Sequence, residues 1–304
     1  MSDRRKYAFN GVYIFENARE HMERADFPEI PIGTIGGIDG WSMKMLVGMT
    51  FDETYYYPLL DTINEEITLK HRIFISYVKK DGSLELDSMA NTYLRTGFGY
   101  SGRGRIVEEL LDEENGYLTD GAIIIEYGLQ IEAIRSPDNI WTFNFRDPLF
   151  DCQEKQNMIS FYKDLGNGQK KWLYCHKQLL IHHSTFFDLD SKENELTIEN
   201  LGSFESFLQI SHGVRLKIDD HKTPEILAPA RKYGLSNVIQ LVDQALDSEI
   251  TISRAISYGL NHRLANLLRK QESLEELAEE LKKVDLETMS GEMMKKCVRR
   301  LFEL

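Results

Sequence analysis

The stretch from Thr96 to Ile134, TGFGYSGRGRIVEELLDEENGYLTDGAIIIEYGLQIEAI, decides between two interpretations of the chain. Gly97, Gly99 and Gly102 match the pattern G-x-G-x-x-G, which in dinucleotide-binding proteins joins a buried strand to a long helix. Here the preceding residues SMANTYLRT are polar, and Gly104 leaves only residues 106–111 for a short helix. The stretch therefore predicts glycine-rich turns between strands and no nucleotide site.

Short runs of β-branched and aromatic residues recur through the first part of the chain, with turn residues between them. The polar run before Gly97 is expected to be a loop or an edge strand, KKDG (79–82) a hairpin turn, and GTIGGIDG (33–40) a flexible surface loop. We predict an antiparallel β-sandwich over residues 5–135. The runs expected to contain its strands are 7–15, 41–47, 54–60, 68–78 and 122–134.

The hydrophobic pattern of the sequence changes after residue 135. Residues 136–153 have no hydrophobic period and carry two prolines, Pro137 and Pro148, so we predict a linker there. Beyond it, MISFY (158–162) and KWLYC (171–175) are short strand-like runs around the turn DLGNGQ, and helical spacing dominates from His176. The second part is therefore expected to be an α/β domain followed by helices.

The C-terminal part contains an internal repeat. Residues 230–241 (ARKYGLSNVIQL) and 255–267 (AISYGLNHRLANL) share an alanine, the triplet Tyr-Gly-Leu and apolar positions at helical spacing. Gly234 and Gly259 are each placed to end one helix in a left-handed conformation. The pattern predicts two helix-turn-helix units, followed by a helix that Ser273 caps.

Composition and motif content argue against several classes of function. The formal charge is −13, which disfavours nucleic acid and anionic membranes as partners. Three scattered cysteines, no long apolar run and no metal-ligand spacing predict an intracellular protein, cytoplasmic or nuclear, without disulfides, membrane span, metal or cofactor. No nucleophile is paired with a base by its spacing, so we do not expect an enzyme.

The opening stretch also carries a resemblance. Its aromatic-Gly-aromatic step, short helix ending in ELLDEENGYL, TDG turn and long closing strand are similar to the C-terminal half of a MATH domain, the TRAF-like β-sandwich. The resemblance implies a groove for an extended peptide, with the alternative for each residue a place in the sandwich core. The implied groove residues are Phe98, Gly99, Tyr100, Tyr93, Tyr55 and Tyr57.

The second part resembles a BTB domain. LYCHKQLLIHHSTFF (173–187), ELTIENLGSFESFLQISHG (195–213) and TPEILAPARKYGLSNVIQLVDQAL (223–246) are similar to successive segments of that family. The resemblance implies a BTB domain over residues 154–247 and a helical extension over 248–304. It further implies dimerisation through Leu179, Leu180 and Phe186, and docking of a cullin scaffold at Phe187 and Leu189.

The order MATH then BTB is similar to that of substrate-recruiting adaptors of cullin-based ubiquitin ligases. Three departures keep an alternative open. Asn157 stands where the family usually has an aspartate, the segment 188–194 is short and lacks the usual hydrophobic-x-Glu element, and Pro229 interrupts an expected helix. The alternative is a divergent scaffold or competitor that homodimerises without binding cullin.

Overall fold

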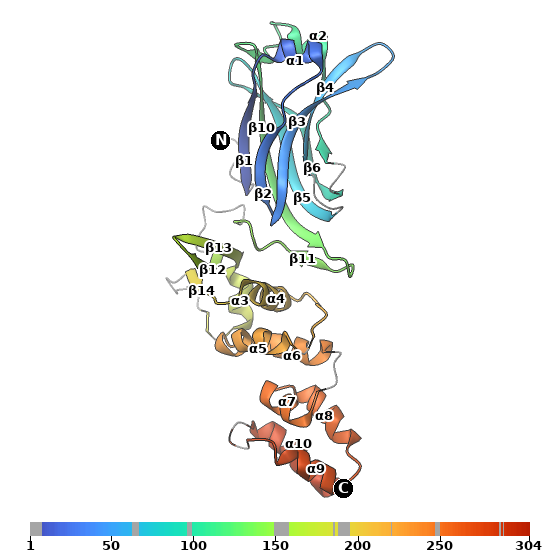
Figure 1. The fold of residues 1–304 in the computed structure, drawn as a ribbon, viewed down its shortest axis with the longest axis vertical. Helices are drawn as coiled ribbons and strands as arrows, with labels where there is room; N and C mark the ends of the chain where they lie inside the picture. The colour runs from blue at the N-terminus through green and yellow to red at the C-terminus, as the bar shows by residue number, and fades with distance from the viewer. Residues whose placement is uncertain are drawn as a thin grey trace. The chain divides into compact units, whose positions relative to one another are not determined.

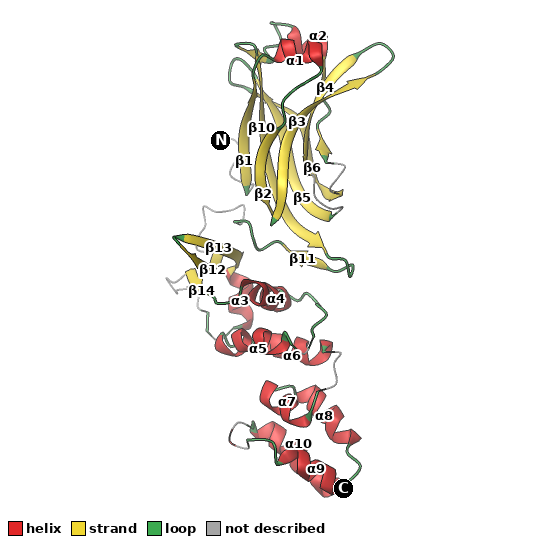
Figure 2. Ribbon diagram, in the orientation of Figure 1, coloured by secondary structure: helices red, strands yellow, loops and turns green. Residues whose placement is uncertain are grey.

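The computed structural model describes residues 8–62, 67–95, 99–148, 158–184, 186–187, 195–219, 221–246, 250–285, 287 and 289–304. The chain divides into two compact units, Met1–Ser160 with Trp172–Cys175, and Phe161–Lys171 with His176–Leu304. The first is built mainly of antiparallel strands and the second mainly of helices (Figures 1 and 2). The prediction of a β-rich N-terminal part followed by a helical part is confirmed.

Two antiparallel sheets form the first unit. One has the order β1-β10-β5-β6, with β9 and β11 also paired to β10, and the other has the order β2-β3-β4-β7, with β8 paired to β4. The strands of the first sheet are β1 (Phe9–Phe15), β5 (Thr68–Val78), β6 (Leu84–Arg95), β9 (Leu118–Thr119), β10 (Ala122–Arg135) and β11 (Trp141–Phe143). Those of the second are β2 (Ile30–Ile35), β3 (Ile38–Met49), β4 (Thr54–Thr62), β7 (Tyr100–Ser101) and β8 (Arg105–Ile106), and the unit also holds the helices α1 (Ala18–Arg24) and α2 (Val107–Leu111).

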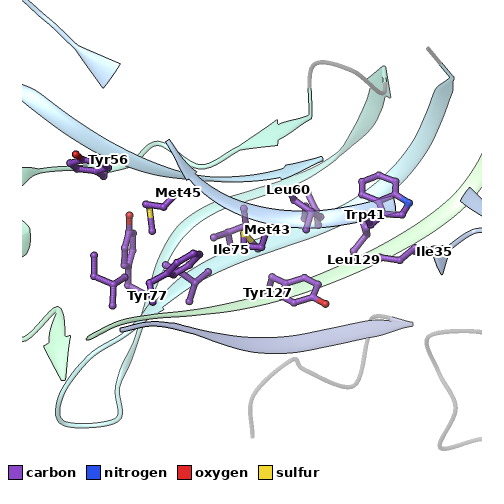
Figure 3. Close-up of a cluster of buried hydrophobic side chains, with 14 of the residues drawn as sticks. Ile35, Trp41, Met43, Met45, Tyr56, Leu60, Ile75, Tyr77, Tyr127 and Leu129 are labelled. Carbon is purple, nitrogen blue, oxygen red and sulfur yellow. The ribbon is translucent and has the colours of Figure 1, made fainter. Parts of the chain in front are cut away.

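One hydrophobic core lies between the two sheets. Figure 3 shows Trp41, Met43 and Leu60 from the second sheet gathered with Ile75 and Leu129 from the first. On β4 the buried positions alternate with half-buried ones, as expected where one face of a sheet is covered, whereas β3, β5 and β10 also bury residues between the core positions, such as Ser42 and Gln130. Burial of this shared core is the main stabilising term of the unit.

Three local expectations can be compared with the structure. The polar run before Gly97 was expected to be a loop or an edge strand. It belongs to β6, which is an edge strand of its sheet. KKDG forms the β5–β6 hairpin turn, where the Gly82 N–H donates to the Lys79 carbonyl over 2.8 Å. GTIGGIDG is not a flexible surface loop: it is the β2–β3 hairpin, with Ile35 and Ile38 buried on either side of a Gly36-Gly37 turn. The alternation of isoleucines around that turn was the signal for strands.

Residues 136–148 also differ from the expected linker. After a turn at Ser136–Ile140, β11 pairs with the end of β10, and Phe145 and Asp147 beyond it are buried. The run WTFNF (141–145) alternates apolar and polar residues, and pairing satisfies the backbone groups that a linker would leave to water. This described part therefore belongs to the first unit.

A separate three-stranded sheet and the remaining helices follow in the chain. Strands β12 (Met158–Gly166), β13 (Gln169–His176) and β14 (Glu195–Thr197) form a sheet of order β13-β12-β14, and the division between the units runs through β12 and β13. Asn167 and Gly168 make the hairpin turn with positive φ angles of 52° and 77°, as Asn-Gly turns do. The helices are α3 (Lys177–His183), α4 (Leu201–Ser211), α5 (Thr223–Lys232), α6 (Ser236–Ala245), α7 (Ile252–Tyr258), α8 (Asn261–Lys270), α9 (Leu274–Leu281) and α10 (Gly291–Glu303).

The repeat predicted in the C-terminal part takes the expected form. Gly234 and Gly259 have φ angles of 63° and 74°, and the leucine after each glycine donates its N–H to the carbonyl of the repeat alanine, Ala230 or Ala255. This bond pattern is the Schellman end of a helix. Pro229 lies inside α5 without ending it, whereas the departure at Asn157 lies outside the described residues.

Candidate functional site

A pair of tyrosine rings lies on the outer face of β4. Tyr55 and Tyr57 alternate with the buried Tyr56, whose hydroxyl donates to the Met22 carbonyl over 2.7 Å. The centres of the Tyr55 and Tyr57 rings are 5.9 Å apart. Tyr55 covers Gly48 on β3, where a Cβ atom would come within 2.2 Å of the ring. The structure therefore brings together these two of the predicted groove residues.

Strand β7 is an edge of the same sheet and pairs with β4 at Leu59 and Leu60, next along that strand to these tyrosines. Gly99 precedes it with φ +66° and lies close to Leu59, where a Cβ would come within 2.7 Å of the leucine side chain. Tyr100 turns the other way: it is half-buried, packs on the core and contacts the ring of His71. Phe98 lies outside the described residues, so its predicted role stays a prediction.

The glycine-rich turn after β7 holds an anion, and that anion is the protein's own carboxylate. Asp87 of β6 accepts the N–H groups of Arg103, over 2.8 Å, and Gly104, over 3.2 Å. A Cβ on Gly102 would lie 2.0 Å from the same carboxylate, so only glycine fits there. The backbone thus forms an anion nest of the kind that phosphate-binding turns use, with Asp87 inside it.

A charged network surrounds Asp87. Arg105 lies 3.6 Å from Asp87 and donates to Glu85 over 2.6 Å, and Tyr117 donates to Glu85 over 2.7 Å. Hydrogen bonds from Lys79 first, then from Tyr117 and Arg105, lower the pKa of Glu85 to about 2. Burial raises the pKa of Asp87, and the backbone N–H bond from Arg103 opposes that shift. The network fixes β7 and β8 against the edge of the opposite sheet.

Tyr93, also predicted for the groove, lies on the other sheet. It is 63% exposed on β6, and its ring centre is 5.4 Å from that of Trp141 on β11. Trp141 and Phe143, which sequence reasoning placed in the linker, line a pocket with Tyr93, Ala133 and Lys70. The alternation in WTFNF could have indicated these exposed aromatic residues.

A second buried carboxylate holds β11 in place. Asp147 accepts the Gly36 N–H with both oxygens, each at 3.0 Å, and the Asn144 side-chain amide over 2.7 Å. The Asn144 N–H donates in turn to the carbonyl of Glu132 on β10. Burial raises the pKa of Asp147, against the hydrogen bonds from Asn144 and Gly36. Asp147 thereby ties the end of β11 to the β2–β3 turn.

The predicted dimer and cullin residues are placed unequally in the second unit. Leu179 is 43% exposed and Phe186 53% exposed, whereas Leu180 is buried at 1% and Phe187 at 7%. The Phe187 ring stacks on Tyr233, with ring centres 5.1 Å apart, inside an aromatic cluster. Leu180 and Phe187 therefore serve the core of the unit, and only Leu179 and Phe186 offer a surface. Leu189 and the segment 188–194 lie outside the described residues.

No group of three or more His, Cys, Asp or Glu side chains is arranged to hold a metal ion in the part of the chain that the structure describes. Within the same ranges, no helix is long and apolar enough to cross a lipid bilayer. No protein-family model matches the chain, and the comparison with curated proteins gave no match.

Proposed function

We propose that the protein is a non-enzymatic interaction adaptor, in which the β-sandwich unit captures an extended peptide along β7. The observation that carries the proposal is the edge strand β7, which pairs with β4 at Leu59, next along that strand to the half-buried ring pair Tyr55–Tyr57. Strand addition uses the main-chain groups of an edge for affinity and neighbouring side-chain pockets for specificity. The resemblance to MATH domains supports the same location.

Hydrogen bonding defines which residue of β7 would meet the peptide. Gly102 donates its N–H to Pro58 of β4 over 2.8 Å, and Ser101 is opposite Leu59. Because bonded and non-bonded positions alternate in an antiparallel pair, the N–H and C=O of Ser101 point away from β4. Ser101 is therefore the donor and acceptor that an added strand would engage.

The proposal extends to the second unit through its resemblance to BTB domains. There the exposed Leu179 and Phe186 would meet a second copy, and pairing two sandwich units would raise avidity for clients with two motifs. In a ligase adaptor, a cullin would dock on this unit. The second candidate is a scaffold or competitor that homodimerises without binding cullin, and the short segment 188–194 favours it. The Cys175 thiol is not a candidate nucleophile, because burial raises its pKa and a protonated thiol is a poor nucleophile.

Selection from a phage-displayed random peptide library tests peptide capture. The enriched peptide, synthesised with a fluorescent label, is expected to bind the Ser101→Ala variant as it binds the wild type, and to lose binding to Ser101→Pro. Proline removes the N–H that faces the free edge, whereas alanine keeps it. Tyr57→Ala is expected to weaken binding about ten-fold. Equal binding to the alanine and proline variants would rule out strand addition at β7.

Light scattering separates the two candidates for the second unit. The wild-type chain is expected to be a dimer, and the pair Leu179→Asp, Phe186→Asp a monomer that still melts in one cooperative transition. A shift to a heavier species with the N-terminal half of the cullin that BTB adaptors use would support the ligase adaptor. A dimer that ignores cullin would support the scaffold, and a monomeric wild-type chain would contradict both.

A further inference from the structure

Four strands place an aromatic row on the outer face of the sheet β1-β10-β5-β6. Pairing sets Phe143 of β11 opposite Ala133, Ala133 opposite Lys70, and Lys70 opposite Tyr93. Trp141 is opposite Arg135, two residues from Ala133 and therefore on the same face. Leu69, Leu94 and Ile134, which alternate with these residues, pack on the core, so the row faces away from it. We name Tyr93, Trp141, Phe143, Lys70 and Ala133 the aromatic platform.

The platform is hollow at its centre. Ala133 is the smallest of its side chains and lies between Phe143 and Lys70, and the residues around it enclose a pocket of about 280 Å³. Tyr93 is 63% exposed and Phe143 43% exposed at its rim. A hollow of this size, floored by alanine and walled by rings, suits one apolar side chain of a ligand.

The charge around the hollow is positive. Lys70 and Arg72 share a single carboxylate, Glu132, at 3.3 and 2.5 Å. Arg135 adds a third cation, with its guanidinium 5.9 Å from the centre of the Trp141 ring. Lys70, Arg72 and Arg135 thus gather three cations around Glu132 in a chain whose formal charge is −13. Acidic groups on a ligand would complement this rim.

Two other ligand classes fit the platform less well. A cationic ligand, such as a methylated lysine, would meet Arg135 over the Trp141 ring and like charges on Lys70 and Arg72. A single-stranded nucleic acid could stack on the rings, yet its bases would leave the hollow over Ala133 unfilled, whereas one apolar side chain of a peptide would occupy it.

We propose that the aromatic platform is a second recognition site, which takes an acidic peptide segment of a partner protein and seats one apolar side chain of that segment over Ala133. The site lies on the sheet opposite to β7 and does not depend on whether β7 binds a peptide. It would let one sandwich unit read two motifs of the same partner.

Fluorescence anisotropy with labelled peptides tests the proposal on the full chain. The probes are an acidic heptapeptide with a central leucine, the same peptide with a central glycine, a basic heptapeptide with a central leucine, and an oligothymidine. The acidic leucine peptide is expected to bind at least about ten-fold more tightly than the other three, the equivalent of one well-placed contact. Equal binding of both acidic peptides, or preference for the basic peptide or the oligonucleotide, would overturn the proposal.

Variants locate the binding. Ala133→Leu fills the hollow and Arg135→Glu reverses one rim charge, and each is expected to weaken binding of the acidic leucine peptide at least about ten-fold. Met89→Ala, exposed on the same strand as Tyr93, and Arg19→Glu, exposed on α1, are the matched controls and are expected to change nothing. Thermal melts identify any variant that fails to fold, and the remaining variant then decides.

The same titration distinguishes this site from β7. Ser101→Pro is expected to leave binding of the acidic leucine peptide unchanged. If Ser101→Pro abolishes that binding while Ala133→Leu does not, the peptide uses the β7 edge and the platform is not a recognition site. Quenching of tryptophan emission that disappears in Trp141→Phe would support the platform independently.

Discussion

Asp87 and Asp147 do the same structural task in two places of the β-sandwich unit. Each is a buried carboxylate that accepts the N–H of a glycine in a left-handed turn, Gly104 at φ +81° or Gly36 at φ +65°. Asp87 fixes the turn after β7, where we propose strand addition, and Asp147 fixes β11, which carries the aromatic platform. Both proposed recognition surfaces are therefore anchored by one carboxylate each.

The two carboxylates differ in how their charge is balanced. Asp87 has Arg105 at 3.6 Å and lies in a network with Glu85 and Tyr117. Asp147 is held by an amide and a backbone N–H, with the charge of Arg146 the weakest influence on its pKa. Removing a paired charge also leaves its partner charge uncompensated, so the loss of stability is large. A charge held only by neutral donors can be replaced by a neutral acceptor at little loss of stability. Removing each one tests this difference.

Asp87→Ala should have the largest effect. The substitution leaves the N–H groups of Arg103 and Gly104 without their acceptor and leaves the half-buried Arg105 with less negative charge around it. We expect the free energy of unfolding to fall by about 3 kcal/mol. All three tryptophans lie in the first unit, so urea unfolding followed by tryptophan fluorescence measures it. A loss below about 1 kcal/mol would mean that water or the turn itself satisfies these donors.

Asp147→Ala should have a smaller effect, about 2 kcal/mol, because a single backbone N–H and one amide lose their acceptor. Asp147→Asn is the matched control: it keeps an acceptor oxygen and removes a charge whose burial is unfavourable, so a change within about 1 kcal/mol is expected. The same urea titration applies. An asparagine variant as unstable as the alanine variant would show that the charge itself holds β11.

The sequence predicted the strands of the sandwich but only part of its surfaces. Alternation and turn residues located β1, β3, β4, β5 and β10, because the covered face of a sheet imposes a period of two on the residues themselves. The same alternation is present in WTFNF and in the isoleucines around Gly36. The flanking prolines and glycines nevertheless led to the predictions of a linker and a flexible loop there. The first of these errors removed Trp141 and Phe143 from the candidate site.

Other features could not have been found in the sequence by local patterns. Asp147 and Gly36 are 111 positions apart, and Asp87 and Gly104 are 17 apart on different sheets, so only the fold brings them together. Likewise, the neighbouring residues in the sequence allow the side chains of Tyr55 and Tyr100 to face either the core or the outer surface. The strand register alone decides that Tyr100 faces the core. The glycine pattern predicted turns between strands, and only the fold shows that Asp87 accepts the N–H groups of one of them.

The smallest expected effect sharpens the comparison through pH. The pKa of Glu85 falls from its ordinary value of 4.5 to about 2 in the folded chain, so the unfolded chain takes up the proton first as pH drops. The stabilisation by this carboxylate is present above about pH 4.5 and is lost as pH falls toward about 2. One third of the Glu85 side chain is exposed, so solvent screening limits the loss to about 1 kcal/mol.

Urea titrations at pH 6 and pH 3 measure this loss in the wild type and in Glu85→Gln, which cannot titrate. The glutamine variant should be less stable at the higher pH and should lose about 1 kcal/mol less than the wild type on acidification. Glu109, which also accepts from Tyr117, offers the control variant Glu109→Gln, for which the wild-type loss should remain. Both glutamine variants could instead lose as much stability as the wild type between pH 6 and pH 3. The carboxylates that titrate would then lie outside the network around Arg105, and Glu85 would add nothing to the stability of the paired Asp87.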